Sequence, residues 1–437
     1  MLPVPSDEVL PRGCETVIVG GGVIGVTAAL FLAERGHDVV LVEKGCIAGE
    51  QSSRNWGWCR QGRRDPREFD LIRESLHLWR GMNARVGGDT GFATCGTFFA
   101  ARDDSTAERY RWWVKEAAQA GIHAEMAGAA TIRALLPGDT APPPAALHCA
   151  SDGRAEPQRA VPLMAMAARK RGARIFTGCA ARGIETGGGR VLTVVTERGA
   201  IACNNVVVAG GAWTRLLLRD LGIDIPQLQV RATVARTQAL AGGPECCFWD
   251  NVIGLRKRAD GGYTLANGLA NVAPVTPDSF RFFREYWPLL AMEWRHLRLR
   301  PDPRLLTGWT RGPVPLDRPS PYEACRVLDP KPDLRFVRAS LAELRRRFPA
   351  LAKARLEQVW AGMIDAMPDT VPVISPVPGL SGLIVATGFS GHGFGIGPGA
   401  GWLVADLLCG ARPLVDPAPF RIGRYTDGSN PRPLFGV

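Results

Sequence analysis

The chain has 437 residues, of which 46% are hydrophobic, and this size and composition suit two or three domains with a substantial core. Its formal net charge of +11 favours an acidic partner, an anionic substrate, a membrane surface or nucleic acid, although an arginine-rich proteome would give the same charge without such a partner. The eleven cysteines include no C-x-x-C pair, which predicts reduced, mostly buried thiols and a cytoplasmic protein.

The ends and the apolar stretches of the chain predict no targeting or membrane-spanning segment. The first residues, MLPVPSDEVLPRG, lack the basic and then apolar layout of a signal peptide. The apolar stretches 16–32 and 383–408 are rich in glycine and favour strand–turn–helix units over membrane spans. We therefore expect a cytoplasmic protein, with peripheral contact at the inner membrane face left open.

Residues 16–44 have the pattern of a βαβ unit that binds a dinucleotide. An apolar strand leads into Gly20, Gly22 and Gly25, which are spaced as G-x-G-x-x-G and open a helical stretch. The helix N-terminus offers free N–H groups and a favourable dipole to a pyrophosphate. Glu43 ends the second strand, where a carboxylate can accept hydrogen bonds from a ribose and would repel a 2′-phosphate, which disfavours NADP. The alternative is a structural βαβ turn without a ligand.

The next stretch, 45–64, reads as a loop that covers this cofactor site. Ser52, Ser53, Arg54 and Asn55 offer hydroxyls, a guanidinium and an amide beside the pyrophosphate. Two tryptophans, at positions 56 and 58, argue for a packed loop over a solvated one.

Hydrophobic periodicity predicts the elements of the middle of the chain. Helices are expected at 66–85, 108–121 and 159–171, strands at 92–101 and 174–177, and a meander of three short strands at 181–203. A return strand at 206–208 then runs into AGGAWT (209–214) and a helix, which brings backbone close to a ligand a second time. Further strands are expected at 230–238 and 262–267, and short helices at 341–348 and 351–356.

The stretch 279–300 is amphipathic, aromatic and basic, and its spacing predicts a helix that breaks at Pro288. Such a stretch could dock a partner or a membrane face, or it could be a helical pair over a core. Residues 311–335 are rich in proline and predict a connecting loop.

The C-terminal part carries the second strong signal. A strand at 383–386 is followed by the glycine-rich stretch TGFSGHGFGIGPGAG, which we expect to form a loop, and by a helix at 402–408. Such a loop lets backbone approach a flat ring closely, and the helix after it would point its positive end at that ring. The alternative, a flexible linker, does not suit a stretch bracketed by a buried strand and a buried helix.

Together these motifs resemble the FAD-dependent amine and amino-acid oxidoreductase family, which includes D-amino-acid oxidase, glycine oxidase and the sarcosine and pipecolate oxidases. The motifs of that family occur in this chain in the same order. They are 17–44, SSRN (52–55), DGRAEP (152–157), VVVAGGAWT (206–214), MPDTVPVI (367–374) and GFSGHGF (388–394). The resemblance implies an α/β fold in which a Rossmann-like, glutathione-reductase-type FAD domain (1–85, 150–225 and 355–437) accompanies a mostly antiparallel substrate domain capped by helices (86–149 and 226–354).

The resemblance also implies the cofactor site residue by residue. The expected FAD-binding residues are Gly20, Gly22, Val23, Ile24, Gly25, Glu43, Lys44, Ser52, Ser53, Arg54, Asn55, Trp56, Ala181, Gly210, Gly211, Trp213, Ser390, Gly391, His392, Gly393, Phe394 and Gly395. Ala181 would contact the adenine through its backbone, and 390–395 would run along the pyrimidine side of the flavin.

Two positions depart from the sarcosine oxidase type. Gly395 stands where that type has a lysine that helps to hold the substrate carboxylate, and Gly362 stands where it has the cysteine that attaches FAD covalently. FAD is therefore expected to be bound without a covalent bond. Arg60, seven residues before Arg67, matches the arginine that binds the substrate carboxylate, with Arg256 and Arg258 as candidates for a second partner.

The implied reaction is oxidation of the C–N bond of an amino acid or related amine, by hydride transfer to flavin N5 and hydrolysis of the imine. Arg60 would anchor the substrate, and His392 would act in catalysis or only in positioning. The electron acceptor is oxygen or a quinone. Two alternatives remain: a flavoprotein that acts on an amino-acid-like group on RNA, which the dispersed arginines make unlikely, or a subunit of a larger amine dehydrogenase.

Overall fold

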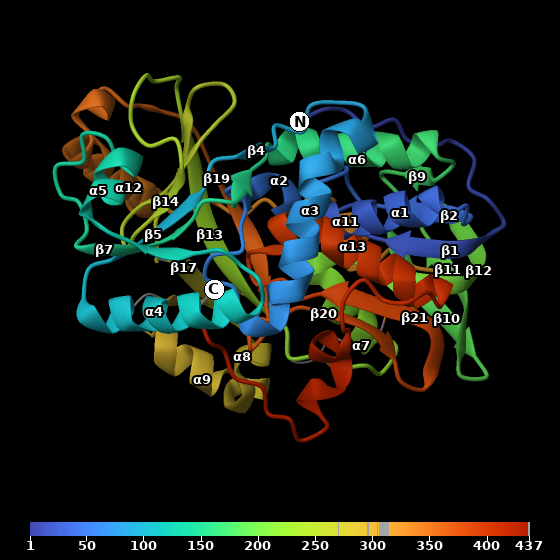
Figure 1. The fold of residues 1–437 in the computed structure, drawn as a ribbon. Coiled ribbons are helices and arrows are strands. Elements are labelled where there is room, and N and C mark those ends of the chain that lie inside the picture. Colours follow the sequence, from blue (N-terminus) through green and yellow to red (C-terminus); the bar gives the residue numbers. More distant parts are fainter. Residues whose placement is uncertain (270, 295–296, 304, 306–313, 436–437) are drawn as a thin grey trace.

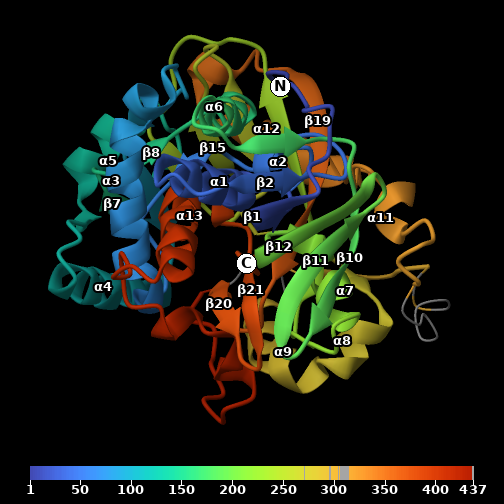
Figure 2. The same cartoon turned by 90° about the vertical axis from the view of Figure 1, so that its right-hand side faces the viewer.

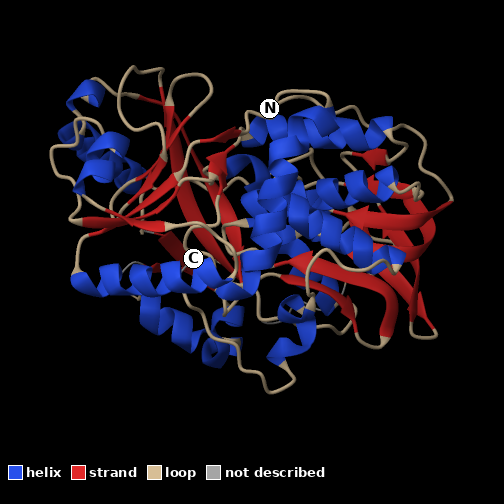
Figure 3. Cartoon of the chain, viewed as in Figure 1, coloured by secondary structure: helices blue, strands red, loops and turns tan. Residues whose placement is uncertain are grey.

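The structure is a computed structural model that describes residues 1–269, 271–294, 297–303, 305 and 314–435. Its strands form an eight-stranded sheet, a ten-stranded sheet and a small three-stranded sheet. The two large sheets stand apart as separate groups of strands, with helices packed around and between them (Figures 1 and 3). This mixed architecture confirms the predicted α/β fold class.

The eight-stranded sheet has the order β10-β11-β21-β12-β1-β2-β9, and β20 pairs with β21. Neighbouring strands from β21 to β9 are parallel, as βαβ connections require. Its strands are β1 (Gly13–Val19), β2 (Val39–Val42), β9 (Arg174–Phe176), β10 (Ala181–Gly187), β11 (Arg190–Thr196), β12 (Gly199–Val208), β20 (Val373–Val377) and β21 (Leu380–Thr387). The predicted meander is present, but its last strand and the predicted return strand are one continuous strand, β12.

A layer of helices covers one face of this sheet. Helix α1 (Val23–Glu34) lies between α6 (Pro157–Lys170) and α13 (Gly393–Cys409), and α3 (Phe69–Val86) packs on α13 (Figures 1 and 2). Helix α1 is buried along nearly its whole length, which explains why its sequence is apolar on all sides.

The C-terminal glycine-rich stretch is a helix over most of its length, and the expected loop is wrong there. Helix α13 begins at Gly393 and not near residue 402. A Cβ at Gly397 would lie 2.7 Å from Val23 Cγ2, and one at Gly401 would lie 2.3 Å from Thr27 Oγ1. The glycines therefore let α13 approach α1 closely, and this packing overrides the low helix propensity of glycine.

The ten-stranded sheet has the order β18-β17-β13-β16-β15-β14-β5-β7-β6, and β19 pairs with β13. Its strands are β5 (Thr97–Ala101), β6 (Glu125–Ala127), β7 (Ala145–Cys149), β13 (Leu228–Thr237), β14 (Cys247–Trp249), β15 (Gly254–Lys257), β16 (Tyr263–Ala266), β17 (Asn271–Val275), β18 (Leu297–Pro301) and β19 (Leu356–Ala366). The helices α4 (Asp104–Gln119), α5 (Ala129–Leu135) and α12 (Leu334–Arg347) lie on this side of the molecule (Figure 1). The short strands β3 (Trp58–Cys59), β4 (Ala93–Thr94) and β8 (Gly153–Arg154) make the small sheet.

Strand β19 corrects two expectations. Its first residue falls where a helix was expected at 351–356, and the structure has only a 3-10 turn at Pro349–Leu351 before it. It pairs with β13 along its length, so it belongs to the second sheet although 355–437 was assigned to the FAD domain. The division into domains otherwise stays a prediction.

The stretch 279–300 also differs from the expectation. Two helices, α8 (Pro277–Arg281) and α9 (Phe283–Glu293), meet at Phe282, while Pro288 lies inside α9 without breaking it. Strand β18 takes the end of the stretch, and residues 295 and 296 lie outside the described part of the chain. Phe283 and Trp287 are 49% and 56% exposed.

Further short helices connect these parts. They are α2 (Gln51–Arg54), α7 (Thr214–Arg219) and α11 (Pro321–Ala324). Within the described residues, no helix is long and apolar enough to cross a membrane.

Candidate functional site

A cavity of about 330 Å³ lies where the carboxyl ends of the parallel strands meet the second sheet. Val19, Val42 and Ala386 line it at the ends of β1, β2 and β21, and Ala232 and Ile364 line it from the second sheet. The carboxyl edge of a parallel sheet is where such folds bind ligands.

The glycine turn at the start of α1 can be built only from glycine. Gly20 has φ +113°, and a Cβ there would lie 2.4 Å from the carbonyl oxygen of Ala209. A Cβ at Gly25 would lie 2.0 Å from the carbonyl oxygen of Gly20. Gly22 caps the helix and lines the cavity. The turn is thus a cradle without side chains at a helix N-terminus, the arrangement that binds a pyrophosphate.

Glu43 lies at the cavity wall beside this turn. Its two carboxylate oxygens accept hydrogen bonds from the backbone N–H groups of Gly21 and Gly45, each at 2.7 Å. Burial raises the pKa of Glu43 despite these bonds. Each oxygen keeps a second lone pair, so the fixed carboxylate can also accept from ribose hydroxyls. Ala181 also lines the cavity.

Lys44 and Trp213 stand together around Glu50. The Lys44 ammonium donates to Glu50 Oε1 at 2.6 Å and to the carbonyl oxygens of Cys325 and Arg326 at 2.8 and 3.0 Å. It also lies 4.5 Å from the centre of the Trp213 ring, whose Nε1 donates to Glu50. Its three N–H donors are thus directed at protein groups, so Lys44 fixes this wall of the cavity.

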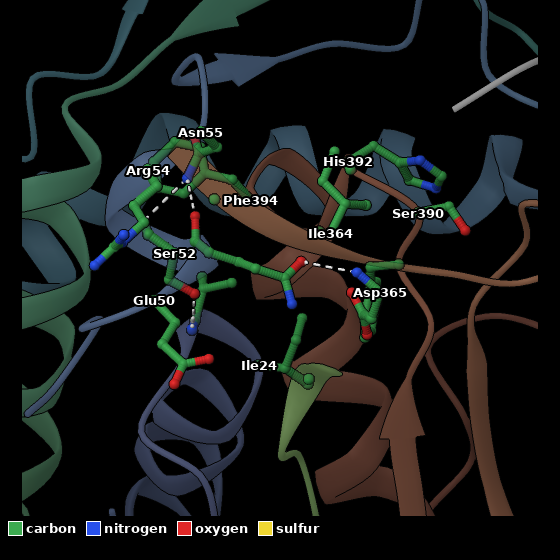
Figure 4. A pocket seen from close by; sticks show the side chains of 18 of the residues that line it. Ile24, Glu50, Ser52, Arg54, Asn55, Ile364, Asp365, Ser390, His392 and Phe394 are labelled. Atoms are coloured by element: carbon green, nitrogen blue, oxygen red, sulfur yellow. Dashed lines mark hydrogen bonds between the residues drawn. The ribbon is translucent and has the colours of Figure 1, made fainter. Parts of the chain in front are cut away.

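The predicted loop at 45–64 contains the short helix α2, whose side chains organise the site (Figure 4). Ser52 Oγ accepts from Val23 N at 2.8 Å, which ties α2 to the start of α1. Asn55 Nδ2 donates to the carbonyl oxygens of Gln51 and Ser52 at the end of α2. Arg54 turns to β19, where its Nη1 donates to the carbonyl oxygen of Ala361 at 2.8 Å.

Asp365 on β19 is a site residue that the sequence reasoning missed. Its Oδ2 accepts from Gly388 N at 2.7 Å and from Thr387 Oγ1 at 3.1 Å. Its backbone N–H donates to Gln51 Oε1 at 3.4 Å, the dashed line at Asp365 in Figure 4. It lines the cavity, and burial raises its pKa. It joins α2, β19 and the strand before α13. A lone aspartate inside an apolar strand was its only signal.

The start of α13 forms the far wall. His392, Gly393 and Phe394 line the cavity there, so the positive end of the helix dipole faces it. Ser390 has φ +46°, and its Oγ accepts from Met367 N at 3.1 Å, which fixes the turn before the helix.

Gly395 does not line the cavity. A Cβ there would lie 2.9 Å from the carbonyl oxygen of Trp58, and its own carbonyl oxygen accepts from Ser75 and Trp79. A side chain such as lysine could enter only if the backbone moved. Gly25 and Ser53 also lie behind the wall, while the other predicted cofactor residues line it.

His392, at the cavity wall, forms a buried pair with Glu68. His392 Nε2 lies 2.8 Å from Oε1 of Glu68, which is 1% exposed. Burial and the charge of Arg64 lower the pKa of His392. Its imidazole is thus engaged with Glu68, which supports a positioning role over proton transfer with a substrate.

Arg60, Arg63 and Arg64 come from one loop after β3. Arg60 and Arg63 line the cavity with Trp58 and Phe99. Burial and the charges of Arg64 and Arg63 lower the pKa of Arg60 well below its usual range. Burial also lowers the pKa of Arg64 to about 10. This loop therefore gives one end of the cavity a positive potential.

The expected second arginines do not reach the cavity, and that expectation is wrong. Arg256 is 1% exposed and pairs with Glu156 at 2.7 Å, while Arg258 pairs with Asp260 at 3.0 Å. The cavity is also lined by Trp56, Trp58 and Trp249.

The site as a whole fits a flavin dinucleotide. One end offers the glycine cradle and Glu43. The other end offers backbone at the start of α13, beside a chamber lined by the aromatic and basic residues Trp58, Phe99, Arg60 and Arg63. A dinucleotide fits the first end through its pyrophosphate and ribose.

The comparisons agree with this geometry. Residues 15–407 match the family described as FAD dependent oxidoreductase. The glycine oxidase of Pseudomonas aeruginosa is 28% identical to this chain, in an alignment that covers 92% of this chain and 97% of the oxidase. The L-amino acid deaminase from Proteus vulgaris superposes with a TM-score of 0.91 at 36% identity, covering 97% of this chain and 100% of that chain. The L-amino acid deaminase from Proteus myxofaciens, solved in complex with anthranilate, superposes with a TM-score of 0.93 at 32% identity. This superposition covers 98% of this chain and 97% of the deaminase.

Proposed function

The chain belongs to the family of FAD-dependent oxidoreductases, and from that premise we propose that its substrate is an α-amino acid held through its carboxylate by Arg60. The enzyme oxidises the C–N bond of an amino acid or related amine with FAD as cofactor, as the resemblance implied. FAD supplies a hydride acceptor, and water hydrolyses the imine product.

The residues of this chain bind and orient the reactants. The start of α1 would hold the pyrophosphate, and Glu43 would hold the ribose. The start of α13 directs a positive dipole toward the cavity, which stabilises negative charge that develops there. Asp365 and Gln51 hold the strand and the helix that flank this point.

One observation carries the assignment of Arg60: its guanidinium lines the cavity, and the pKa of Arg60 is lowered by burial next to two further arginines. A carboxylate placed against it would relieve this cost and form a charge-assisted pair. Trp58 and Phe99 would exclude water from the pair, which strengthens it. The relatives compared are named for amino-acid substrates, which all carry a carboxylate.

The test is an anaerobic panel of amines and amino acids, in both enantiomers, with bleaching of the flavin band as the readout. We expect bleaching by α-amino acids and none by the matching amines that lack a carboxylate. Bleaching by the decarboxylated amines at an equal rate would refute the anchor. Admitting air to the bleached enzyme, or adding a quinone, then identifies the electron acceptor.

We also propose that FAD is bound without a covalent bond. Gly362 lines the cavity at the position of the attachment cysteine, and a Cβ there would lie 3.3 Å from Arg54 Cβ. Cys59 is the cysteine closest in sequence to residues 52–55, which we expect to contact FAD. It is fully buried and does not line the cavity. Acid precipitation should release yellow cofactor into the supernatant, and a yellow pellet would contradict the proposal.

A further inference from the structure

Arg63 occupies a box of aromatic rings at the edge of the cavity. Its guanidinium carbon lies 4.3 Å from the centre of the Trp249 ring, 5.4 Å from Phe435, 5.5 Å from Phe99 and 6.0 Å from Tyr110. Trp249, Phe435 and Phe99 line the cavity together with Arg63. Such rings stabilise a cation by their faces but leave its N–H groups without acceptors.

The backbone at Arg63 is held in an unusual conformation. Its φ is +58°, in the left-handed region that is unfavourable for a residue with a long side chain. Strained positions of this kind persist where the surrounding structure enforces them, and they gather at functional sites. Here the side chain lies in the aromatic box, where its Nε is buried.

The hydrogen-bonding groups of Arg63 are not satisfied by the protein. Its Nε is buried and has no hydrogen-bond partner among the described residues. In contrast, Arg60 donates to the carbonyl oxygen of Gly62. Arg64 donates to the carbonyl oxygens of Arg60 and His392. Arg63 therefore has donors left to offer to a ligand, as Arg60 does beyond its bond to Gly62.

The charges around this end of the cavity do not balance. Asp152, a buried carboxylate at this loop, accepts from the backbone N–H groups of Gln61 and Gly62 at 2.7 and 3.1 Å and from Thr97, so it holds the loop in place. Asp65, also buried, pairs with Arg67 at 2.8 Å. Glu68 is engaged by His392. Among the described residues neither Arg60 nor Arg63 forms an ion pair with a carboxylate, so their charge is available to a ligand, and one carboxylate would compensate only part of it.

We propose that Arg63 binds a second carboxylate, on the side chain of the substrate, and that the enzyme prefers dicarboxylic amino acids. This inference rests on the proposed function, in which Arg60 holds the α-carboxylate. The aromatic rings around Arg63 would pack on the methylene groups of the substrate and keep the ion pair dry. The competing explanation is that Arg63 only holds the aromatic rings together.

The first experiment compares pairs of substrates that differ only in the side-chain charge. Aspartate is compared with asparagine and glutamate with glutamine, each as both enantiomers, by anaerobic flavin bleaching and by kcat/KM. We expect at least one dicarboxylic amino acid to exceed its amide by roughly tenfold or more, since hydrogen bonds to charged groups are the strong ones. Equal kcat/KM for acid and amide would overturn the proposal while leaving the proposed function intact.

The second experiment changes Arg63 itself. Arg63→Met keeps an apolar side chain in the box and removes the charge, and we expect it to lower kcat/KM for the dicarboxylic substrate roughly 10- to 100-fold while the amide changes less than threefold. Arg63→Lys should recover part of the loss. Arg346→Met removes an arginine that is 59% exposed and should change neither value. An equal loss for acid and amide would show a purely structural role.

A binding measurement separates recognition from folding and from chemistry. Glutarate and butyrate are titrated into the oxidised holoenzyme, with perturbation of the flavin spectrum as the readout. The wild type should bind glutarate at least roughly tenfold more tightly than butyrate, and Arg63→Met should lose this preference. If Arg63→Met does not fold, Arg63→Gly replaces it, because glycine adopts a positive φ without strain. A preference that survives in the variant would refute the proposal.

Discussion

At the scale of single residues, the arginines at the cavity carry the sharpest expectations. Replacement of Arg60 by lysine keeps the charge but loses the planar fork, so turnover should already fall. Arg60→Ala should raise KM for the substrate roughly 10- to 100-fold, because it removes a hydrogen-bonded charge pair. The FAD content should stay unchanged, since Arg60 lies in the chamber away from the glycine turn.

The measurement is steady-state kinetics together with the ratio of flavin to protein absorbance. Arg335→Ala, a change at an arginine that is 62% exposed, is the matched control. An Arg60→Ala enzyme with normal KM would remove Arg60 from the site.

The pair of Glu68 and His392 leads to a prediction about pH. Burial alone would raise the pKa of Glu68, but the charges of His392 and Arg64 outweigh burial and lower it from 4.5. A carboxylate with a lowered pKa in the folded state adds stability that is present above its unfolded pKa and is lost as the pH falls through the folded value.

Glu68→Gln should therefore destabilise the protein by about 1–3 kcal/mol at pH 7. The difference in melting temperature from the wild type should shrink as the pH falls below 4.5, the ordinary value for a glutamate. Melting curves of both proteins at pH 7, 5 and 4, with saturating FAD, measure this difference in melting temperature. A difference that does not change with pH would mean that the charge of Glu68 contributes nothing.

Most of the predicted cofactor residues line the cavity, because they belong to motifs of fixed spacing. Glycines before a helix and an acid after the next strand constrain the backbone locally, so their roles can be inferred without tertiary information. Asp365 and Arg63 carry no such local signal. The importance of Asp365 depends on Gly388 and Gln51, and that of Arg63 on aromatic rings from distant segments.

At the scale of elements, α13 offers a test of close helix packing. Gly401→Ala would favour the helix by about 1 kcal/mol through propensity, but its Cβ would meet Thr27 Oγ1 at 2.3 Å. Overpacking in a buried interface typically costs about 1–3 kcal/mol, so the net effect should be destabilising.

Gly81→Ala is the matched control for this change. Gly81 lies in α3, and a Cβ there would have nothing within 4 Å. This variant should be more stable by up to about 1 kcal/mol. Thermal unfolding of the two holoenzymes measures both effects, and a stabilised Gly401→Ala protein would show that α13 and α1 can move apart without cost.

Elements with a clear periodicity were predicted well, and those shaped by tertiary contacts were not. Helices α4 and α6 begin within a few residues of their expected places, because each has one apolar face. The glycine-rich half of α13 was predicted as a loop, since propensity argues against a helix that only close packing explains. The short strands β14, β15 and β17 were missed because they contain only three to five residues, and β14 also pairs with the distant strand β5.

At the scale of the whole molecule, the cavity that we propose for FAD is lined from both sheets, so a bound cofactor should couple their stabilities. Residues from the first sheet, from α2 and from β13 and β19 line one cavity, so we expect FAD to bind only when both sheets are folded. A ligand at 1,000 times its Kd stabilises the folded state by about 4 kcal/mol.

Removal of FAD should therefore lower the melting temperature by several degrees, and calorimetry should show one transition in both forms. Two transitions, of which only one moves with FAD, would mean that the sheets unfold independently. The apoprotein reconstituted with FAD is the control for irreversible damage.

Strand β19 has a consequence for recombining this chain with its relatives. The strand pairs with β13, yet Arg54 and Gln51 bind its backbone at Ala361 and Asp365. A chimera with a crossover inside 356–366 would join a strand edge from one parent to helix α2 from another, so both sets of hydrogen bonds would have to match by chance. Segment exchange should succeed only when α2, β13 and β19 come from the same parent, whatever their distance along the gene.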